Sequence, residues 1–232
     1  MAELTRILIV FIAQSFIFIL FLILAFKVLI KKRNRASITL ASFYILLDLG
    51  LLSNMIFIIL TPSDEFVLLT VFYYLALYFI IFPIIFILIF INIMLKLEEV
   101  FTIKKIIILI LTYGILCALL FLIPNGITFS IDWYALYSIP FSLSLMTLIT
   151  LFIIIPTIFY SFKLYKSFKA KDLKKKLRYF LTGVVLLFII LYGAIIFNSS
   201  LNDLYRTVWV NLAFFLEIMG GFLIYYGLGR EL

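Results

Sequence analysis

Two acidic residues of this sequence, Asp48 and Glu217, each lie in the middle of a long apolar stretch. A charged side chain at the centre of a bilayer costs at least about 2.5 kcal/mol on insertion scales, so such residues usually turn toward other helices and find a partner. Because two neighbouring carboxylates cannot easily both ionise, we expect at least one to be protonated, or a cation to lie between them. Residues of this type and placement predict a site for a proton, a cation or a small ligand.

A structural interpretation of the two acids is also open. A neutral carboxyl group can hold neighbouring helices together through hydrogen bonds, and Ser53, Asn54 and Asn211 are the candidate partners within the same apolar stretches. Asn54 and the more distant Tyr73 also lie toward the outer half of their stretches, where they would either line an outward-facing pocket or serve as packing contacts.

The residues that most enzymes and metal sites need are scarce in this chain. It has no histidine and a single cysteine, Cys117, so it lacks the commonest general base and metal ligand and can form no intrachain disulfide. No Walker loop, GxSxG or GxGxxG motif occurs. We therefore expect no enzymatic activity, no bound metal and no cofactor.

The composition indicates that the elements carrying these residues lie in lipid. The chain has 232 residues, of which 67% are hydrophobic and 13% are charged, against about 45–50% apolar and about 25% charged in soluble domains. A spanning helix needs about 20 apolar residues, and we expect an all-α membrane protein whose single domain, residues 1–232, has seven transmembrane helices. The predicted spans are residues 7–30, 38–60, 66–95, 106–123, 136–162, 180–197 and 207–228. We interpret the first as a retained helix and not as a cleaved signal peptide, because it is too long and has no small-residue cleavage site.

The basic residues alternate between the predicted loops. Seventeen of the nineteen Lys and Arg residues lie on one side: sixteen in the loops after spans one, three and five or beyond span seven, and Lys27 at the inner end of span one. Short loops rich in Lys and Arg stay in the cytoplasm, so we expect the N-terminus outside and the C-terminus in the cytoplasm. The net charge of +8 then reflects topology and contact with the anionic lipids of the cytoplasmic leaflet, not nucleic-acid binding.

This topology also predicts the depth of the two acids. At about 1.5 Å of rise per residue, Asp48 lies about 15 Å above the inner end of span two and Glu217 about 16 Å above the inner end of span seven. If both face the bundle interior, they are neighbours. Lys27, near the inner end of span one, either snorkels to the interface or reaches Asp48.

A basic, partly aromatic segment at residues 163–178 lies between spans five and six. We expect span five to continue as a helix past the membrane and to keep the lysines on lipid phosphates. The segment serves either as an orientation signal with lipid anchoring or as a docking surface for a cytoplasmic protein. The candidate surface residues are Lys169, Lys171, Lys174, Lys175, Lys176 and Arg178.

Three features of the sequence together define a pattern. They are the short loops, the basic stretch KKKLRYFLTGVVLLF before span six, and the Gly- and Tyr-rich end of span seven, EIMGGFLIYYGLGR. In this pattern the chain resembles the seven-helix membrane-sensor region at the N-terminus of some prokaryotic histidine kinases. The resemblance implies a sensor-like module in the plasma membrane of a prokaryote. Since no kinase sequence follows Leu232, the module is expected to signal through a protein partner.

Three functions are compatible with these features. The first is a non-enzymatic receptor or sensor that responds to a small or lipidic ligand, or to protonation, near Asp48 and Glu217. The second is a small carrier for a cation or an apolar metabolite. The third is a structural subunit of a larger membrane complex, which the small amount of predicted water-exposed surface favours.

Overall fold

Hydrocarbon offers no hydrogen bonds to the backbone, so a chain crosses it as helices that satisfy their own backbone groups. The computed structural model has this form, with seven stretches that are long and apolar enough to span a membrane. It describes residues 2–31, 33–61, 65–95, 102–130, 134–200 and 202–231, and the backbone alone at residues 2–10, 203 and 231. The chain is therefore a multi-pass helical membrane protein.

Two of the seven spans are built from more than one element. The elements are α1 (Ala2–Lys31), α2 (Arg35–Leu60), α3 (Phe66–Ile81), α4 (Ile84–Met94), α5 (Ile103–Leu120), β1 (Ile127–Phe129), β2 (Ala135–Tyr137), α6 (Ile139–Ile149), the π-helical η3 (Thr150–Ile154), α7 (Ile155–Ser167), α8 (Lys171–Ser199), α9 (Asp203–Gly227) and the short 3₁₀ helix η4 (Gly229–Glu231). The third span comprises α3 and α4, and the fifth comprises α6, η3 and α7.

Several span boundaries differ from the predicted ones by a few residues, and two of the differences have a clear physical reason. The fifth span begins at Ile139 and not at residue 136, because Ala135–Tyr137 form the second strand of an antiparallel hairpin and Ser138 caps the helix through the amide of Phe141. The sixth span begins at Lys171 and not at residue 180, since the basic residues continue the helix and do not form a loop. Long lysine side chains can leave their helix for the aqueous interface, so charge does not mark the end of the helix.

Prolines interrupt the third and fifth spans. Pro83 separates α3 from α4, and Pro156 lies in the first turn of α7, directly after the π-helical segment η3. Proline lacks a backbone N–H and clashes with the carbonyl group one turn earlier, and single π-helical turns occur inside helices near such distortions. A proline inside an apolar span predicts a kink at its position, but it does not predict the π-helical segment that precedes Pro156.

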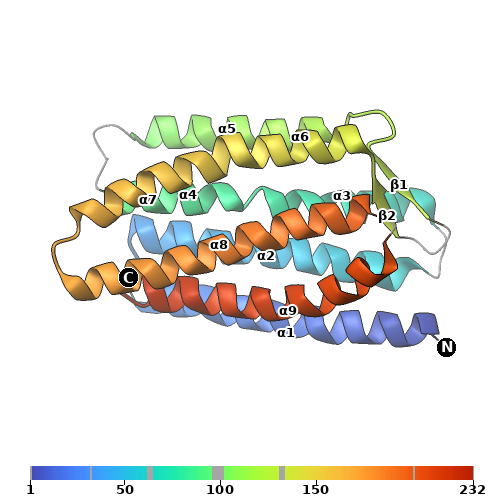
Figure 1. Ribbon diagram of the computed structural model, residues 1–232, viewed down its shortest axis with the longest axis horizontal. Helices are drawn as coiled ribbons and strands as arrows, with labels where there is room; N and C mark the ends of the chain where they lie inside the picture. Colours follow the sequence, from blue (N-terminus) through green and yellow to red (C-terminus); the bar gives the residue numbers. More distant parts are fainter. Residues whose placement is uncertain are drawn as a thin grey trace.

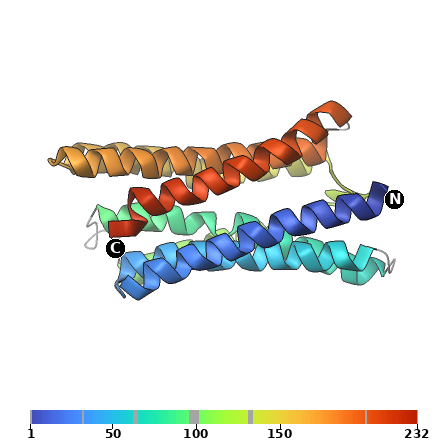
Figure 2. The same ribbon diagram turned by 90° about the horizontal axis from the view of Figure 1, so that it is seen from below.

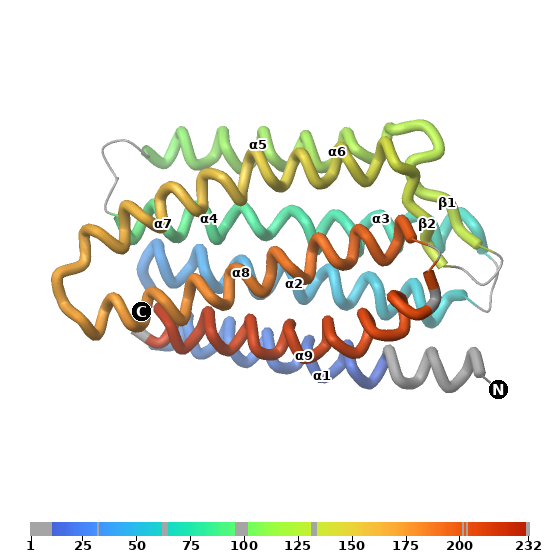
Figure 3. The backbone as a smooth tube through the Cα atoms, viewed as in Figure 1, coloured from blue at the N-terminus to red at the C-terminus, as the bar shows by residue number. Residues whose placement is uncertain are grey.

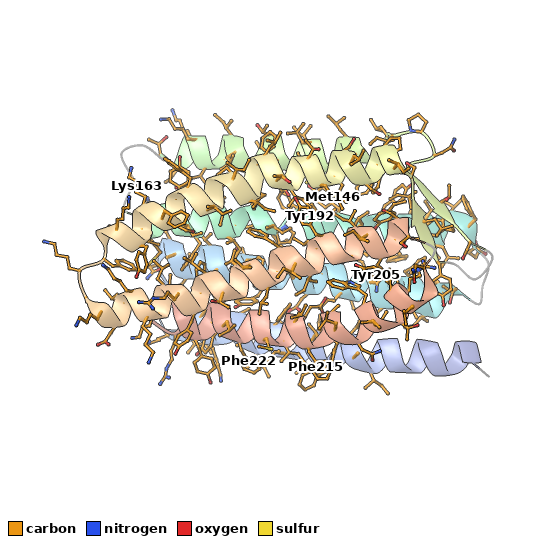
Figure 4. All side chains as sticks on the ribbon, viewed as in Figure 1. Met146, Lys163, Tyr192, Tyr205, Phe215 and Phe222 are labelled. Carbon is orange, nitrogen blue, oxygen red and sulfur yellow. The ribbon has the colours of Figure 1, made fainter. Side chains whose placement is uncertain are left out.

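The helices lie side by side along one long axis (Figures 1 and 2). Helices α1 and α9 run along one edge and α5 along the opposite edge, with α2, α3, α4, α6, α7 and α8 between them, as the tube in Figure 3 also shows. Phe215 and Phe222 of α9 point away from the bundle (Figure 4), and Phe215 is 62% exposed. In a membrane protein, such exposed apolar side chains face lipid.

The two ends of the bundle differ in composition. One end of the bundle carries the α7–α8 connection (Figure 1). The same end holds the last turns of α1, α4 and α9 and the first turns of α2 and α5. We call this end the basic end, because most Lys and Arg residues of the sequence cluster near these helix termini. The β1–β2 hairpin lies at the other end, which we call the hairpin end.

Glycines bring α8 and α9 into close contact. A Cβ atom on Gly183 of α8 would lie 2.8 Å from the carbonyl oxygen of Gly220 and 2.9 Å from the amide nitrogen of Ile224. A Cβ atom on Gly227 of α9 would lie 2.4 Å from the amide nitrogen of Phe180. Small residues of this kind let membrane helices approach backbone to backbone, and they hold the last two spans together.

Candidate ligand-binding cavities

One hydrogen bond sets the relative height of α2 and α9. The hydroxyl group of Tyr44 donates to the carbonyl oxygen of Gly221 at 3.0 Å. Asp48 follows Tyr44 by four residues, and Glu217 precedes Gly221 by four. Since the two helices run in opposite directions (Figure 1), both acids lie about 6 Å from this hydrogen bond toward the hairpin end. The two carboxyl groups therefore lie at the same depth.

Asp48 is buried without a hydrogen-bonding partner. Its side chain is 3% exposed, and neither carboxyl oxygen has a hydrogen bond within the described residues. Gln14 of α1 likewise has a buried side-chain oxygen without a partner there. A buried polar group without a partner costs about 1–3 kcal/mol. Asp48 therefore does not hold helices together through hydrogen bonds.

The expected partners of the two acids lie elsewhere. Ser53 donates to the carbonyl oxygen of Leu49, and Asn211 lies on the exposed side of α9, where it donates to the carbonyl oxygen of Thr207. Lys27 is exposed, and its amine lies 6.0 Å from the centre of the Tyr225 ring. The interpretation of Ser53, Asn54 or Asn211 as hydrogen-bonding partners of Asp48 is therefore wrong, and Lys27 does not reach it either.

Glu217 faces a small cavity inside the bundle, which we call the Glu217 cavity. Its volume is about 80 Å³, and its walls come from α1, α2, α3, α4, α8 and α9. Glu217 is the single ionisable residue among the described residues that line it. The remaining lining residues are Ile17, Phe21, Phe43, Leu47, Leu51, Ile80, Ile84, Leu187, Ile190 and Leu191. A carboxyl group is thus presented to an otherwise apolar chamber.

A second cavity of about 220 Å³, the hairpin cavity, adjoins the first. Ile80 and Leu191 line both cavities, so the two lie side by side. The polar residues of the hairpin cavity are Asn54, Tyr73, Tyr137 and Asn198. Asn54 therefore lies in a cavity wall, as one of the two interpretations of its position predicts.

Tyr137 of the hairpin closes one side of this cavity. Its hydroxyl group lies 2.7 Å from that of Tyr73. The rings of Phe57 and Phe129 both pack edge-on against the ring of Tyr73. Burial raises the pKa of Tyr137 above its ordinary value of 10.0, against the opposing effect of its hydrogen bonds to Tyr73 and Asn198. The phenol is therefore neutral at physiological pH and can donate or accept a hydrogen bond.

Sequence reasoning missed Tyr137 and Asn198 as cavity residues. Tyr137 falls in the predicted fifth span, residues 136–162, but reaches the cavity through the β-hairpin instead. Asn198 lies one residue beyond the predicted sixth span, residues 180–197, and belongs to α8. The Asn125–Gly126 pair is a typical turn signal, and Asn125 indeed has a φ of 51°. This pair marks the turn before β1, within the loop predicted between spans four and five.

Packing closes the bundle between the Glu217 cavity and the basic end. Val28, Leu40, Tyr44, Ile224 and Leu228 are each at most 1% exposed, and they come from α1, α2, α9 and the residue after α9. The cavities consequently extend toward the hairpin end and not through the bundle.

The predicted basic surface lies at the opposite end from the hairpin cavity. Lys169 lies in the short connection between α7 and α8, and Lys171, Lys174, Lys175, Lys176 and Arg178 lie in the first turns of α8. The amine of Lys174 and the guanidinium of Arg178 lie 5.2 and 5.9 Å from the centre of the Tyr165 ring. Lys163 of α7 points away from the bundle at the same end (Figure 4). Trp133, which the predicted topology places at the outer membrane interface where tryptophan is enriched, lies outside the described residues.

Replacing Tyr137 by phenylalanine should destabilise the protein by about 1–3 kcal/mol, because the buried hydroxyl group of Tyr73 loses its partner. The double variant Tyr73→Phe/Tyr137→Phe should lose less than the sum of the single variants. Thermal unfolding in detergent measures both effects, and Tyr226→Phe, whose ring is 51% exposed, is the control. Since the Tyr137 phenol stays neutral while an unfolded tyrosine ionises near pH 10, stability should fall only above about pH 10. Equal losses in the Tyr137 and Tyr226 variants would contradict the hydrogen bond.

Comparisons of the chain with models of known protein families, with curated proteins and with solved structures give no match.

Proposed function

We propose that this chain is a sensor- or receptor-like membrane module, without enzymatic activity, that binds a small ligand in the Glu217 cavity. The observation that carries the proposal is the position of the Glu217 cavity beside the hairpin cavity, with tight packing toward the basic end. Closed packing on one side suits ligand binding without passage through the membrane. Binding would be reported to a protein partner.

The orientation belongs to the proposal. The basic end faces the cytoplasm because Lys- and Arg-rich loops stay there, so the N-terminus and the hairpin cavity face outward. The resemblance to the sensor regions of prokaryotic histidine kinases supports both the plasma membrane of a prokaryote and signalling through a partner. The ligand would then come from outside the cell.

The chemistry of the two cavities selects the class of ligand. Within the described lining, Glu217 is the one group of the Glu217 cavity that can carry a charge, and it is negative when ionised. A cation beside a buried carboxylate favours its charged form and repays part of the desolvation cost. The surrounding walls are apolar. A small amine with an apolar body fits both properties, and the cavity volumes of about 80 and 220 Å³ exclude a bulky one.

A homologous pair of probes tests this proposal. We expect n-octylamine to raise the thermal unfolding midpoint of the purified protein more than n-octanol does, because only the amine supplies a cation for Glu217. A ligand at 100 times its dissociation constant adds about 2.7 kcal/mol to stability. Glu217→Gln should abolish the difference between the two probes. Asp172→Asn, which removes an exposed acid on α8, should preserve it. Equal shifts with both probes, or an unchanged difference in Glu217→Gln, would refute amine binding at Glu217.

One observation favours the carrier as a second candidate. Ile80, Ile81 and Ile84 flank the break at Pro83 and line the two cavities, and transporters commonly build their sites from interrupted helices. In that case, the closed packing toward the basic end is one of two alternating states. Proteoliposomes would then show Na⁺ or proton flux that Glu217→Gln abolishes, whereas a sensor shows none. Co-purification with other membrane proteins in mild detergent tests the remaining role, that of a complex subunit.

A further inference from the structure

A groove of about 490 Å³ lies between α7 and α8, toward the basic end and apart from the two cavities described above. Its walls are almost entirely carbon, with Phe162 on α7 and Val185 and Phe188 on α8 among the lining residues. Its volume falls within the range of about 300–1,000 Å³ that is usual for ligand sites. An apolar groove of this size on the side of a membrane protein is exposed to lipid.

The length of the groove matches one leaflet. Along α8, the lining extends from Arg178 to Phe188, and ten residues of helix cover about 15 Å. The hydrocarbon core of a bilayer is about 30 Å thick, so the groove spans half of it. One acyl chain extends over the same depth.

The polar end of the groove is cationic. Arg178 lines it, and the guanidinium of Arg178 and the amine of Lys174 both lie over the ring of Tyr165, another lining residue. Residues 163–178 contain eight Lys and Arg residues and one acid, Asp172. Each basic residue near an anionic surface contributes about 1 kcal/mol to its attraction. The charge at this end therefore suits a phosphate-bearing, net-negative headgroup.

We propose that this groove is a binding site for one anionic phospholipid of the leaflet at the basic end. Its phosphate binds Arg178 and Lys174, and one acyl chain lies along Val185 and Phe188. The site is independent of the ligand proposed for Glu217.

Native mass spectrometry of the detergent-purified protein tests the site, with dioleoylphosphatidylglycerol and dioleoylphosphatidylcholine as the probes. We expect tighter binding of the glycerol lipid. Removing one cation, Arg178→Gln, should weaken its binding about fivefold, which is the loss of about 1 kcal/mol per basic residue. Lys175→Gln, which removes an exposed lysine outside the groove lining, should change it less than twofold. Equal binding of the two lipids, or equal effects of the two substitutions, would overturn the proposal.

A second pair of variants tests the apolar part. Val185→Trp fills the groove and should abolish the tightly bound lipid, whereas Ile189→Trp, at an exposed position of the same helix outside the lining, should retain it. Retention of the lipid in Val185→Trp would show that it binds elsewhere. If Val185→Trp aggregates on gel filtration, the Arg178 and Lys175 variants decide the outcome.

Discussion

Alanine at Gly227 should lower the stability of this protein sharply. The added Cβ atom would lie 2.4 Å from the amide nitrogen and 2.7 Å from the Cα atom of Phe180. These are backbone atoms of a long helix and cannot rotate away, so α8 and α9 must separate. Overpacking of this kind costs about 1–3 kcal/mol and occasionally more. The measurement is the unfolding midpoint of the purified protein in detergent, followed by gel filtration after heating.

The chain offers its own control for this effect. A Cβ atom on Gly220, at the same helix pair, would find its nearest neighbour at 3.4 Å, which is an ordinary contact. Gly220→Ala should therefore leave the midpoint nearly unchanged, while Gly183→Ala, with backbone atoms at 2.8 and 2.9 Å, should behave like Gly227→Ala. Equal losses at Gly220 and Gly227 would mean that helix propensity or lipid contact, and not close approach, sets the effect.

Replacing Asp48 by valine should stabilise the protein, which is unusual for a buried position. The carboxyl group is buried and lacks a hydrogen bond within the described residues, and an unsatisfied buried polar group costs about 1–3 kcal/mol. Valine is similar in size and removes that cost, whereas asparagine keeps polar atoms that need partners. The thermal unfolding midpoint of Asp48→Val should therefore be higher than that of the wild type, and the midpoint of Asp48→Asn should be close to the wild-type value.

The same variant separates the roles of the two acids. Asp48 lies at the depth of Glu217 but does not line the Glu217 cavity. If Asp48→Val also loses the difference between n-octylamine and n-octanol, both acids belong to the ligand site; if it keeps the difference, Glu217 binds the amine without Asp48. A clear destabilisation by Asp48→Val would contradict the absence of a stabilising partner for this carboxyl group.

The number of spans and the matching depth of the two acids followed from the sequence. Apolar length fixes the spans because hydrocarbon has a fixed thickness. A constant rise per residue then fixes the depth of any residue within its helix, and the hydrogen bond from Tyr44 to Gly221 agrees with the predicted match. Both properties depend on distance along a helix axis, which the sequence records directly.

The angular position of a residue around its helix axis can also be predicted in part from the sequence. Successive residues turn by about 100°, so Asn211 and Glu217, six residues apart, lie about 120° from each other around α9. This angle is consistent with Asn211 on the exposed side and Glu217 in a cavity wall. Asp48 and Asn54 are separated in the same way on α2. The proposed pairing of the acids with asparagines could therefore have been doubted before the structure was known.

Only the tertiary structure decided which residues meet across helices. The hairpin that carries Tyr137 into a cavity wall, the unpaired state of Asp48 and the groove between α7 and α8 all depend on contacts between residues far apart in the chain. Such contacts are set by how whole helices pack and rotate against one another, and many different side-chain pairings satisfy the same apolar pattern. Local sequence therefore determined how each helix crosses the membrane and at what depth its polar residues lie, whereas packing determined what those residues touch.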